Sequence, residues 1–212
     1  MPYRRMRDPT YRTEQHRRRY DSHVAPINTL VDELAATAGR GWLPYVAPIY
    51  GGVDARVLSV FRDPGPATQV GSGSGMLSIE NDDPSAERYA TLLAEAGLRA
   101  SELVPWNAYP WYINRKPSAA ELDAGAEVLH RLIALMPRLR VVLLHGGDAQ
   151  AGWRRFARRF PGTADGVMVV SSYHTSRQAF WHPDPAVRAE RLAKLRSDLV
   201  AVVRLLAAEP GR

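Results

Sequence analysis

The sequence predicts an α/β protein with three layers, in which helices cover both faces of a central four-stranded parallel sheet. Short apolar runs alternate along the chain with longer segments of helical periodicity, which is the element order of parallel α/β folds. The runs are apolar throughout rather than at every second residue, which is typical of strands buried on both faces. We expect the four strands at residues 56–61, 102–106, 139–144 and 167–172.

Helices are expected at residues 27–38, 84–97, 118–136, 148–160 and 185–208. Pro84 in the first turn and Gly97 after the last turn mark the two ends of one of them. Ser118 is a suitable N-cap, and Glu121 three residues later completes a capping box. Segments 39–52 and 63–83 are rich in glycine and proline, so we expect loops there.

Basic charge is concentrated at the N-terminus. Residues 1–20 hold seven arginines against Asp8 and Glu14, a net +5 of the formal +6 of the whole chain. We therefore expect a basic flexible arm at residues 1–22 and a single α/β domain at residues 23–212. All but Lys116 and Lys194 of the 28 basic residues are arginine. Arginine suits a polyanionic partner, but codon bias in a GC-rich genome explains its abundance equally well.

The composition excludes several classes of protein. With 45% apolar and 24% charged residues, the 212-residue chain is globular rather than disordered. No apolar run reaches the ~18 residues of a membrane span, and the N-terminus lacks the apolar core of a secretory signal. The absence of cysteine excludes disulfides, thiolate catalysis, and cysteine-bound zinc or iron–sulfur clusters.

Polar residues follow three of the predicted strands, at the sheet edge where parallel α/β proteins bind ligands. Asp63 follows the first strand and is either a carboxylate held in the crevice by Pro64 or a turn cap. Asn107 follows the second strand among aromatic residues. Its amide suits the edge of a nucleobase, although a turn-forming role is favoured when this loop is taken alone.

Two histidines follow the remaining strands. His145 is expected to be a structural residue with satisfied hydrogen bonds, whereas His174 is either an idle loop residue or a donor to a developing anion. Because the ends of parallel strands share one rim, we expect Asp63, Asn107 and His174 to converge. A Ser–His–Asp hydrolase is less favoured since no GxSxG elbow exists, and a metal site is less favoured since the histidines lack ligand spacing.

These motifs, in this order, resemble those of the uracil-DNA glycosylase superfamily. The stretch from Phe61 to Pro66 reads FRDPGP and is most similar to the NPGP…QTG motif of the single-strand-selective monofunctional branch, with Gln69 and Gly71 following. Asn107-Ala108-Tyr109-Pro110 resembles the N-x-x-P motif of that branch, and His174-Thr175-Ser176 resembles the H-P-S opening of the last motif. The resemblance spans roughly residues 57–180.

The chain departs from the motifs at defined positions. Asp63 replaces the Asn of the most similar branch and matches the Asp of the G-Q-D-P-Y enzymes. Those enzymes have a Tyr, which excludes the thymine methyl, at the position of Gly65 in this chain. Leu77 stands where relatives have a base-stacking Phe, and Thr175 replaces the Pro of H-P-S. Phe61 replaces the usual Gly of the first motif. The resemblance therefore implies a divergent member with a less strictly walled pocket.

The resemblance implies a monofunctional DNA N-glycosylase of base excision repair, a hydrolase that flips out and releases a damaged base such as uracil. Asp63 and His174 would be the catalytic pair, and a further set would bind substrate: Asn107, Gly65, Ala67, Leu77 and Ser176. Arg177 and Gln178 would contact DNA where relatives insert a wedge, and the basic arm would add salt-sensitive affinity.

The same resemblance implies no cofactor, no iron–sulfur cluster and no membrane partner, and we expect a cytoplasmic, nucleoid-associated monomer. Two alternatives stay open. One is a lesion-DNA-binding or base-binding protein of the same fold with weak or no turnover, which the residues Leu77 and Thr175 favour. The other is an enzyme acting on free nucleosides or nucleotides, which would not need the basic arm.

Overall fold

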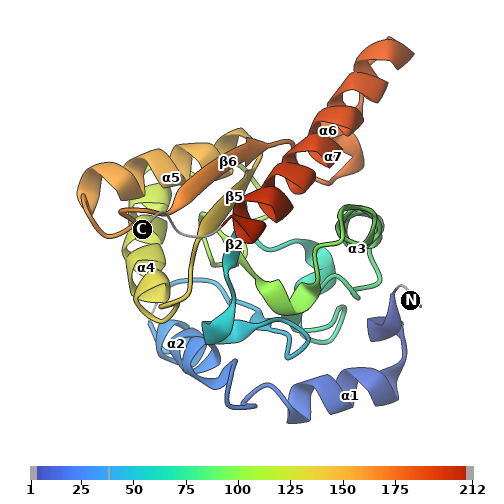
Figure 1. Ribbon diagram of the computed structural model, residues 1–212. Coiled ribbons are helices and arrows are strands. Elements are labelled where there is room, and N and C mark those ends of the chain that lie inside the picture. The colour runs from blue at the N-terminus through green and yellow to red at the C-terminus, as the bar shows by residue number, and fades with distance from the viewer. Residues whose placement is uncertain (1–3, 38, 209–212) are drawn as a thin grey trace.

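The computed structural model of the protein describes residues 4–37 and 39–208 (Figure 1). Its centre is a four-stranded sheet of β2 (Val57–Phe61), β4 (Leu103–Asn107), β5 (Val141–His145) and β6 (Met168–Ser172). All neighbouring strands are parallel, in the order β4-β2-β5-β6. The predicted four-stranded parallel sheet is therefore confirmed, and each strand lies within two residues of its expected bounds.

Helices pack on both faces of this sheet, as the three-layer prediction requires. The larger helices are α2 (Ala25–Ala35), α3 (Pro84–Ala96), α4 (Ala119–Ala134), α5 (Gly147–Arg159) and α7 (Pro185–Ala207). Helices α4 and α5 lie against each other on one side of the strands, whereas α3 and α7 lie together on the other side (Figure 1). The last residue of the helix expected at 27–38 lies outside the described residues.

The helix ends follow the local signals of the sequence. The Asp83 side chain accepts a hydrogen bond from the Ala86 N–H at 2.8 Å and caps α3. Gly97, at φ +74°, ends that helix in the left-handed conformation that glycine adopts without steric cost. Ser118 and Glu121 form the predicted capping box at the start of α4. These caps fix the residues at which α3 begins and ends and at which α4 begins.

One apolar core joins the layers and extends from Met6 to Leu206. Every residue of β5 is buried, and Leu58 of β2 is fully buried beside it. Truncating a leucine at such a position to alanine costs about 2–5 kcal/mol. The edge strand β6 differs, because Met168 and Val169 are 53% and 43% exposed. The expectation that all four strands are buried on both faces is therefore wrong for β6.

Residues 4–22, the described part of the segment expected to be a flexible arm, contain regular secondary structure. This segment forms η1 (Arg5–Arg7) and the helix α1 (Pro9–Arg17), with Asp8 as the cap of α1. Met6 is 2% exposed and belongs to the main core. Residues 1–3 lie outside the described residues.

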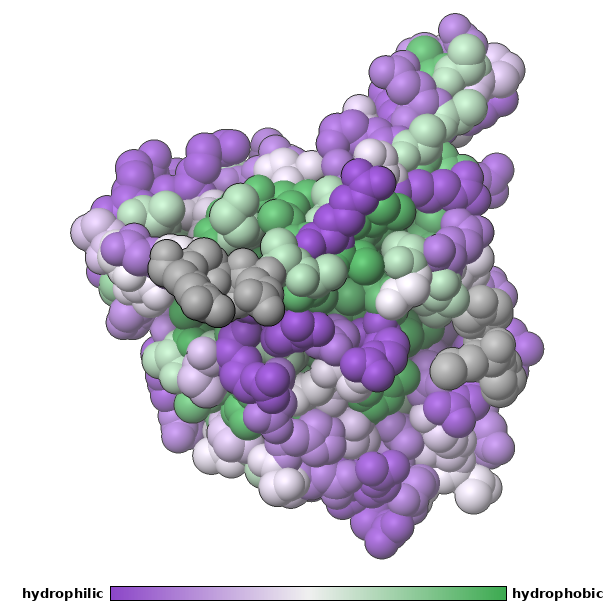
Figure 2. Space-filling model, in the orientation of Figure 1, coloured by the Kyte–Doolittle hydropathy of each residue, from purple (hydrophilic) through white to green (hydrophobic). Residues whose placement is uncertain are grey.

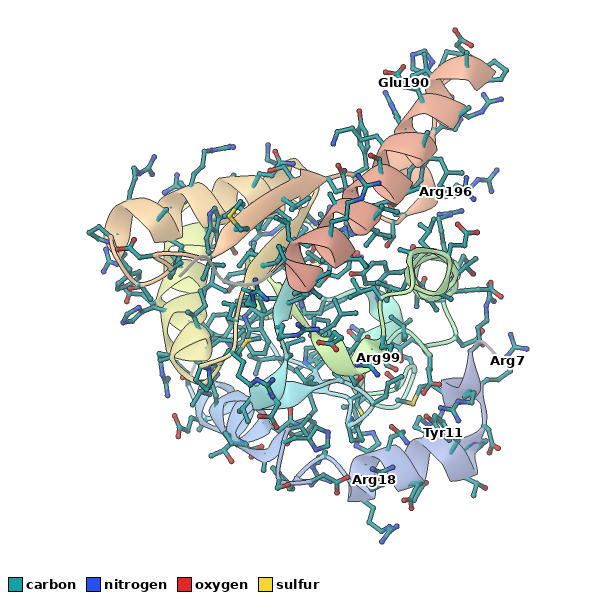
Figure 3. The ribbon with its side chains drawn as sticks, viewed as in Figure 1. Arg7, Tyr11, Arg18, Arg99, Glu190 and Arg196 are labelled. Atoms are coloured by element: carbon teal, nitrogen blue, oxygen red, sulfur yellow. The ribbon has the colours of Figure 1, made fainter. Side chains whose placement is uncertain are left out.

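Acidic partners explain why this basic segment folds. Arg4 contacts Glu87 at 2.6 Å, Arg7 contacts Asp82 at 2.9 Å, and Arg5 donates to Glu80 at 2.6 Å. Figure 3 shows the segment lying along the body of the molecule, with Arg7 near its start and Tyr11 on its helix. A local charge pattern cannot reveal partners that lie more than 70 residues away along the chain.

A second sheet occupies the segments expected to be loops. Its two parallel strands, β1 (Tyr45–Val46) and β3 (Met76–Leu77), are too short to show periodicity in the sequence. Three 3₁₀ turns, η2 (Gly52–Asp54), η3 (Pro66–Thr68) and η4 (Ala100–Glu102), also lie between the main elements. The buried Asn28 of α2 fixes β1, since its amide bonds both the N–H and the C=O of Val46.

The surface in Figure 2 is mostly hydrophilic, and the projecting half of α7 carries mainly charged and small residues. Apolar side chains gather between α5 and α7, where Met168, Val169 and Val200 are exposed. None of the described helices combines the length and apolar character that crossing a membrane requires. Within residues 4–37 and 39–208, no three side chains of the metal-binding types are grouped as a metal site would need.

Candidate functional site

The carboxyl ends of the four strands open into a cavity of about 570 Å³. Loops after all four strands contribute to its wall, and residues 77–86 close it from the side of β3 and α3. The structure thus places the cavity at the edge predicted for the ligand site of a parallel sheet. Eight of the nine predicted site residues line it: Asp63, Gly65, Ala67, Leu77, Asn107, His174, Ser176 and Gln178. The ninth, Arg177, is exposed at the start of the short helix α6 (Arg177–Phe180) and is not part of the cavity wall.

Asp63 is held in place by two donors. Its side chain is only 3% exposed, and the turn that follows is stiffened by the buried Pro64. One carboxylate oxygen accepts the backbone N–H of Asn114 at 2.9 Å, and the other pairs with the Arg62 guanidinium. Two charge-assisted hydrogen bonds of this kind fix both the position and the orientation of a carboxylate.

Asn107 ends β4 directly opposite Phe61 of β2. The residue is 3% exposed, but its amide forms no side-chain hydrogen bond with any other described residue. The amide therefore offers a donor and an acceptor to whatever enters the cavity.

His174 is a neutral imidazole whose tautomer is set by its neighbour. Its Nδ1 accepts the backbone N–H of Ser176 at 3.0 Å, so the ring proton is on Nε2. Burial and, to a smaller extent, the positive charge of Arg62 lower the pKa of His174 to about 4, although Asp83 acts in the opposite direction. At neutral pH the side chain consequently presents an uncharged Nε2–H donor.

His145 lies in the cavity wall but has no free nitrogen. Its Nδ1 donates to the Tyr173 carbonyl at 3.2 Å, and its Nε2 accepts the Ser59 hydroxyl at 2.9 Å. Burial lowers its pKa to about 3, so it is neutral as well. This agrees with the sequence-based expectation of a structural histidine with satisfied hydrogen bonds.

The sequence reasoning missed several residues of the wall. Asn114, at φ +50°, supplies a backbone donor to Asp63, and only its residue type hinted at the left-handed conformation. Asn81 donates to the Met76 carbonyl at 2.9 Å, and its Oδ1 has no partner among the described residues. Tyr89 also lines the cavity, and no local signal marks it.

The sheet topology and the edge cavity place the protein among the parallel α/β proteins whose ligand site lies at the carboxyl ends of the strands. The site has an oriented carboxylate on one loop, an unpaired amide on a second and a neutral donor on a third. The sequence profile of the Uracil DNA glycosylase superfamily matches residues 48–196, well over half of the chain, so this protein belongs to that superfamily. Members of the superfamily are generally DNA glycosylases, which are hydrolases that take DNA as their substrate. No curated protein matches the chain in sequence.

Proposed function

We propose that this protein is a monofunctional DNA glycosylase that releases a deaminated base such as uracil from DNA. The observation that carries the proposal is that Asp63, Asn107 and His174, from three different strand ends, line one cavity. A nucleotide rotated out of the helix can bring its base into such a cavity, at a cost of a few kcal/mol.

Asp63 would act on the sugar. When the N-glycosidic bond breaks, its electron pair leaves with the base and the sugar becomes an oxocarbenium ion. A carboxylate stabilises this cation and orients the water whose oxygen adds to C1′, as carboxylates do in glycoside hydrolysis. The hydrogen bond from Asn114 supports this role because it holds the carboxylate within the cavity wall.

His174 would act on the departing base. Its neutral Nε2–H can donate to a base carbonyl oxygen as negative charge grows there. Removing one preorganised donor of this kind costs about 10²–10³ in rate. Since the ring is already neutral at pH 7, no proton has to leave it before the donor can act.

Asn107 would read the polar edge of the base through its unpaired amide. Substitution of an amide that binds a polar substrate edge removes far more selectivity than loss of one methyl contact. The cavity, at about 570 Å³, has room for bases larger than uracil. No cavity-lining residue among those described is a lysine, so the wall lacks the amine that a Schiff-base strand-cleaving step needs.

A second candidate function is binding of damaged DNA with weak turnover. The observation that favours it is the Arg62 guanidinium paired with Asp63, which opposes the negative field that a sugar cation needs. Leu77 in the wall, which cannot stack on a base as an aromatic ring does, favours it as well.

Incubation with single- and double-stranded oligonucleotides that contain uracil, hypoxanthine or xanthine, followed by alkaline scission, tests both candidates. D63N and H174A are expected to lower base release by about 10²-fold or more. The matched controls are D123N, a surface carboxylate paired with Arg155, and H182A. The Nδ1 of His182 accepts a backbone N–H at 3.1 Å as that of His174 does, but His182 lies outside the cavity wall.

The outcomes separate the candidates. Base release that depends on Asp63 and His174 supports the glycosylase. Tight lesion-dependent binding without release supports the second candidate. A protein that shows neither base release nor selective binding would contradict both candidates.

A further inference from the structure

A buried chain of hydrogen bonds joins two residues of the cavity wall, Tyr89 and His145, through Ser59 behind them. Tyr89 and Ser59 are in contact through their hydroxyls at 2.8 Å, and Ser59 contacts the Nε2 of His145 at 2.9 Å. The Nδ1 of His145 then contacts the Tyr173 carbonyl at 3.2 Å. None of the three side chains belongs to a residue that is more than 4% exposed.

The chemistry of the groups gives this chain one direction. A carbonyl only accepts, so Nδ1 of His145 must donate to Tyr173. In a neutral imidazole Nε2 then accepts, so the Ser59 hydroxyl donates to it and in turn accepts the Tyr89 hydroxyl proton. Every O–H and N–H donor on the path has one acceptor, which leaves the His145 ring a single orientation.

Two contacts lead from this ring to His174. The first is the backbone, since the Tyr173 carbonyl that His145 holds belongs to the residue just before His174. The second is Phe61, which stacks on His145 at 4.3 Å and 6° and meets the His174 ring edge-to-face at 5.5 Å and 82°. A side chain held from both sides in this way has little rotational freedom.

We propose that His145, anchored by Ser59 and Tyr89, is a positioning residue that orients His174 through the Tyr173 carbonyl and the Phe61 ring. It does not touch the base. The inference rests on the proposed function only in that His174 is taken as the donor to the base. The orientation itself is a property of the free protein.

Two variants test the proposal. Y89F removes one hydroxyl from the far end of the chain and keeps its ring, whereas H145F keeps the stack on Phe61 and loses both nitrogens. A displacement of about 1 Å in a reacting group lowers rates by about 10²-fold. H145F is therefore expected to lower kcat for base release by about 10²-fold and Y89F by about threefold, with KM within twofold of wild type.

The matched control is H130F. His130 stacks on Phe160 at 4.2 Å and 6° and its Nδ1 contacts the Thr163 hydroxyl at 3.3 Å, so it repeats the geometry of His145 away from the cavity. This variant is expected to leave kcat unchanged. If H145F fails to fold, Y89F retains the test because it removes a single oxygen atom.

The second measurement is ¹⁵N NMR of His174 in the free protein. Wild type and H130F are expected to show the Nε2–H tautomer alone, whereas H145F and Y89F are expected to show an admixture of the Nδ1–H tautomer. Unchanged His174 signals in both variants overturn the positioning role, whatever the protein does to DNA. Altered His174 signals in a protein that releases no base uphold the positioning role and contradict the proposed function instead.

Discussion

Two histidines with lowered pKa values, the buried His145 and the half-buried His174, are expected to make the folded protein sensitive to acid, and the size of the effect follows from their pKa values. His174 has a pKa of about 4 and His145 of about 3 in the folded protein, against about 6.5 in an unfolded chain. As the pH falls below 6.5, the unfolded chain takes up protons that the folded protein does not bind. The free energy of unfolding therefore decreases until the pH passes the folded pKa values.

The magnitude is large on the scale of protein stability. At about 1.4 kcal/mol per pH unit, complete titration removes about 3 kcal/mol through His174 and about 5 kcal/mol through His145. A domain of this size is typically stable by about 5–15 kcal/mol. We therefore expect the free energy of unfolding to fall progressively below pH 6.5, with most of the loss reached only near pH 3–4.

Urea unfolding of wild type and H174Q at pH 7.5, 6.5, 5.5 and 4.5 measures the contribution of His174. Removal of the imidazole is expected to reduce the loss of unfolding free energy between pH 7.5 and 4.5 by about 2–3 kcal/mol. Carboxylates that titrate over the same range contribute equally to both proteins and cancel in the difference. Parallel curves for wild type and H174Q would refute the conclusion that His174 is buried as a neutral ring.

Three further predictions concern the cavity wall. G65Y is expected to fold, because Gly65 has φ −80° and its Cβ would meet no atom within 4 Å; measured release should fall for hypoxanthine far more than for uracil. N114V is expected to lower the free energy of unfolding by about 1–3 kcal/mol in a thermal melt, because a β-branched residue is strained at φ +50°, and to slow base release by shifting the backbone N–H that binds Asp63; N114G, which adopts φ +50° without strain and leaves that N–H in place, should do neither. E80Q is expected to lower the free energy of unfolding by about 1–2 kcal/mol and to expose residues 4–22 to limited proteolysis, because the buried Glu80 carboxylate binds Arg5 and Tyr11 and is 6% exposed. An equal effect of E33Q, which changes an exposed carboxylate paired with Arg131, would contradict this.

Local signals predicted those parts of the molecule that depend on neighbouring residues. The capping box of Ser118 and Glu121 and the glycine end of α3 form within one helical turn, so the sequence contains all that is needed to predict them. The convergence of Asp63 and His174 was also predictable, because parallel strands place their carboxyl ends on one edge. Their lining of one cavity agrees with that prediction.

The N-terminal segment shows where such reasoning stops. Seven arginines in twenty residues indicated a mobile basic arm, and the structure shows Arg5 and Arg7 engaged by Glu80 and Asp82. Ion pairs between distant segments depend on how the chain folds and leave no pattern in either segment. Arg4, Arg5 and Arg7 bind the segment that contributes residues 77–86 to the cavity wall, so fewer arginines are free for DNA than their number suggests.

By itself, the sequence determined the parallel sheet, its flanking helices and the presence of Asp63, Asn107 and His174 at its edge. Hydrophobic periodicity and strand-end position are properties of contiguous residues, and they carry this information directly. Only the tertiary structure decided the protonation and tautomer of His174, the orientation of Asp63 and the chain of hydrogen bonds through His145. Each of these depends on burial and on hydrogen-bond partners supplied by other strands and loops, which exist only once the chain has folded.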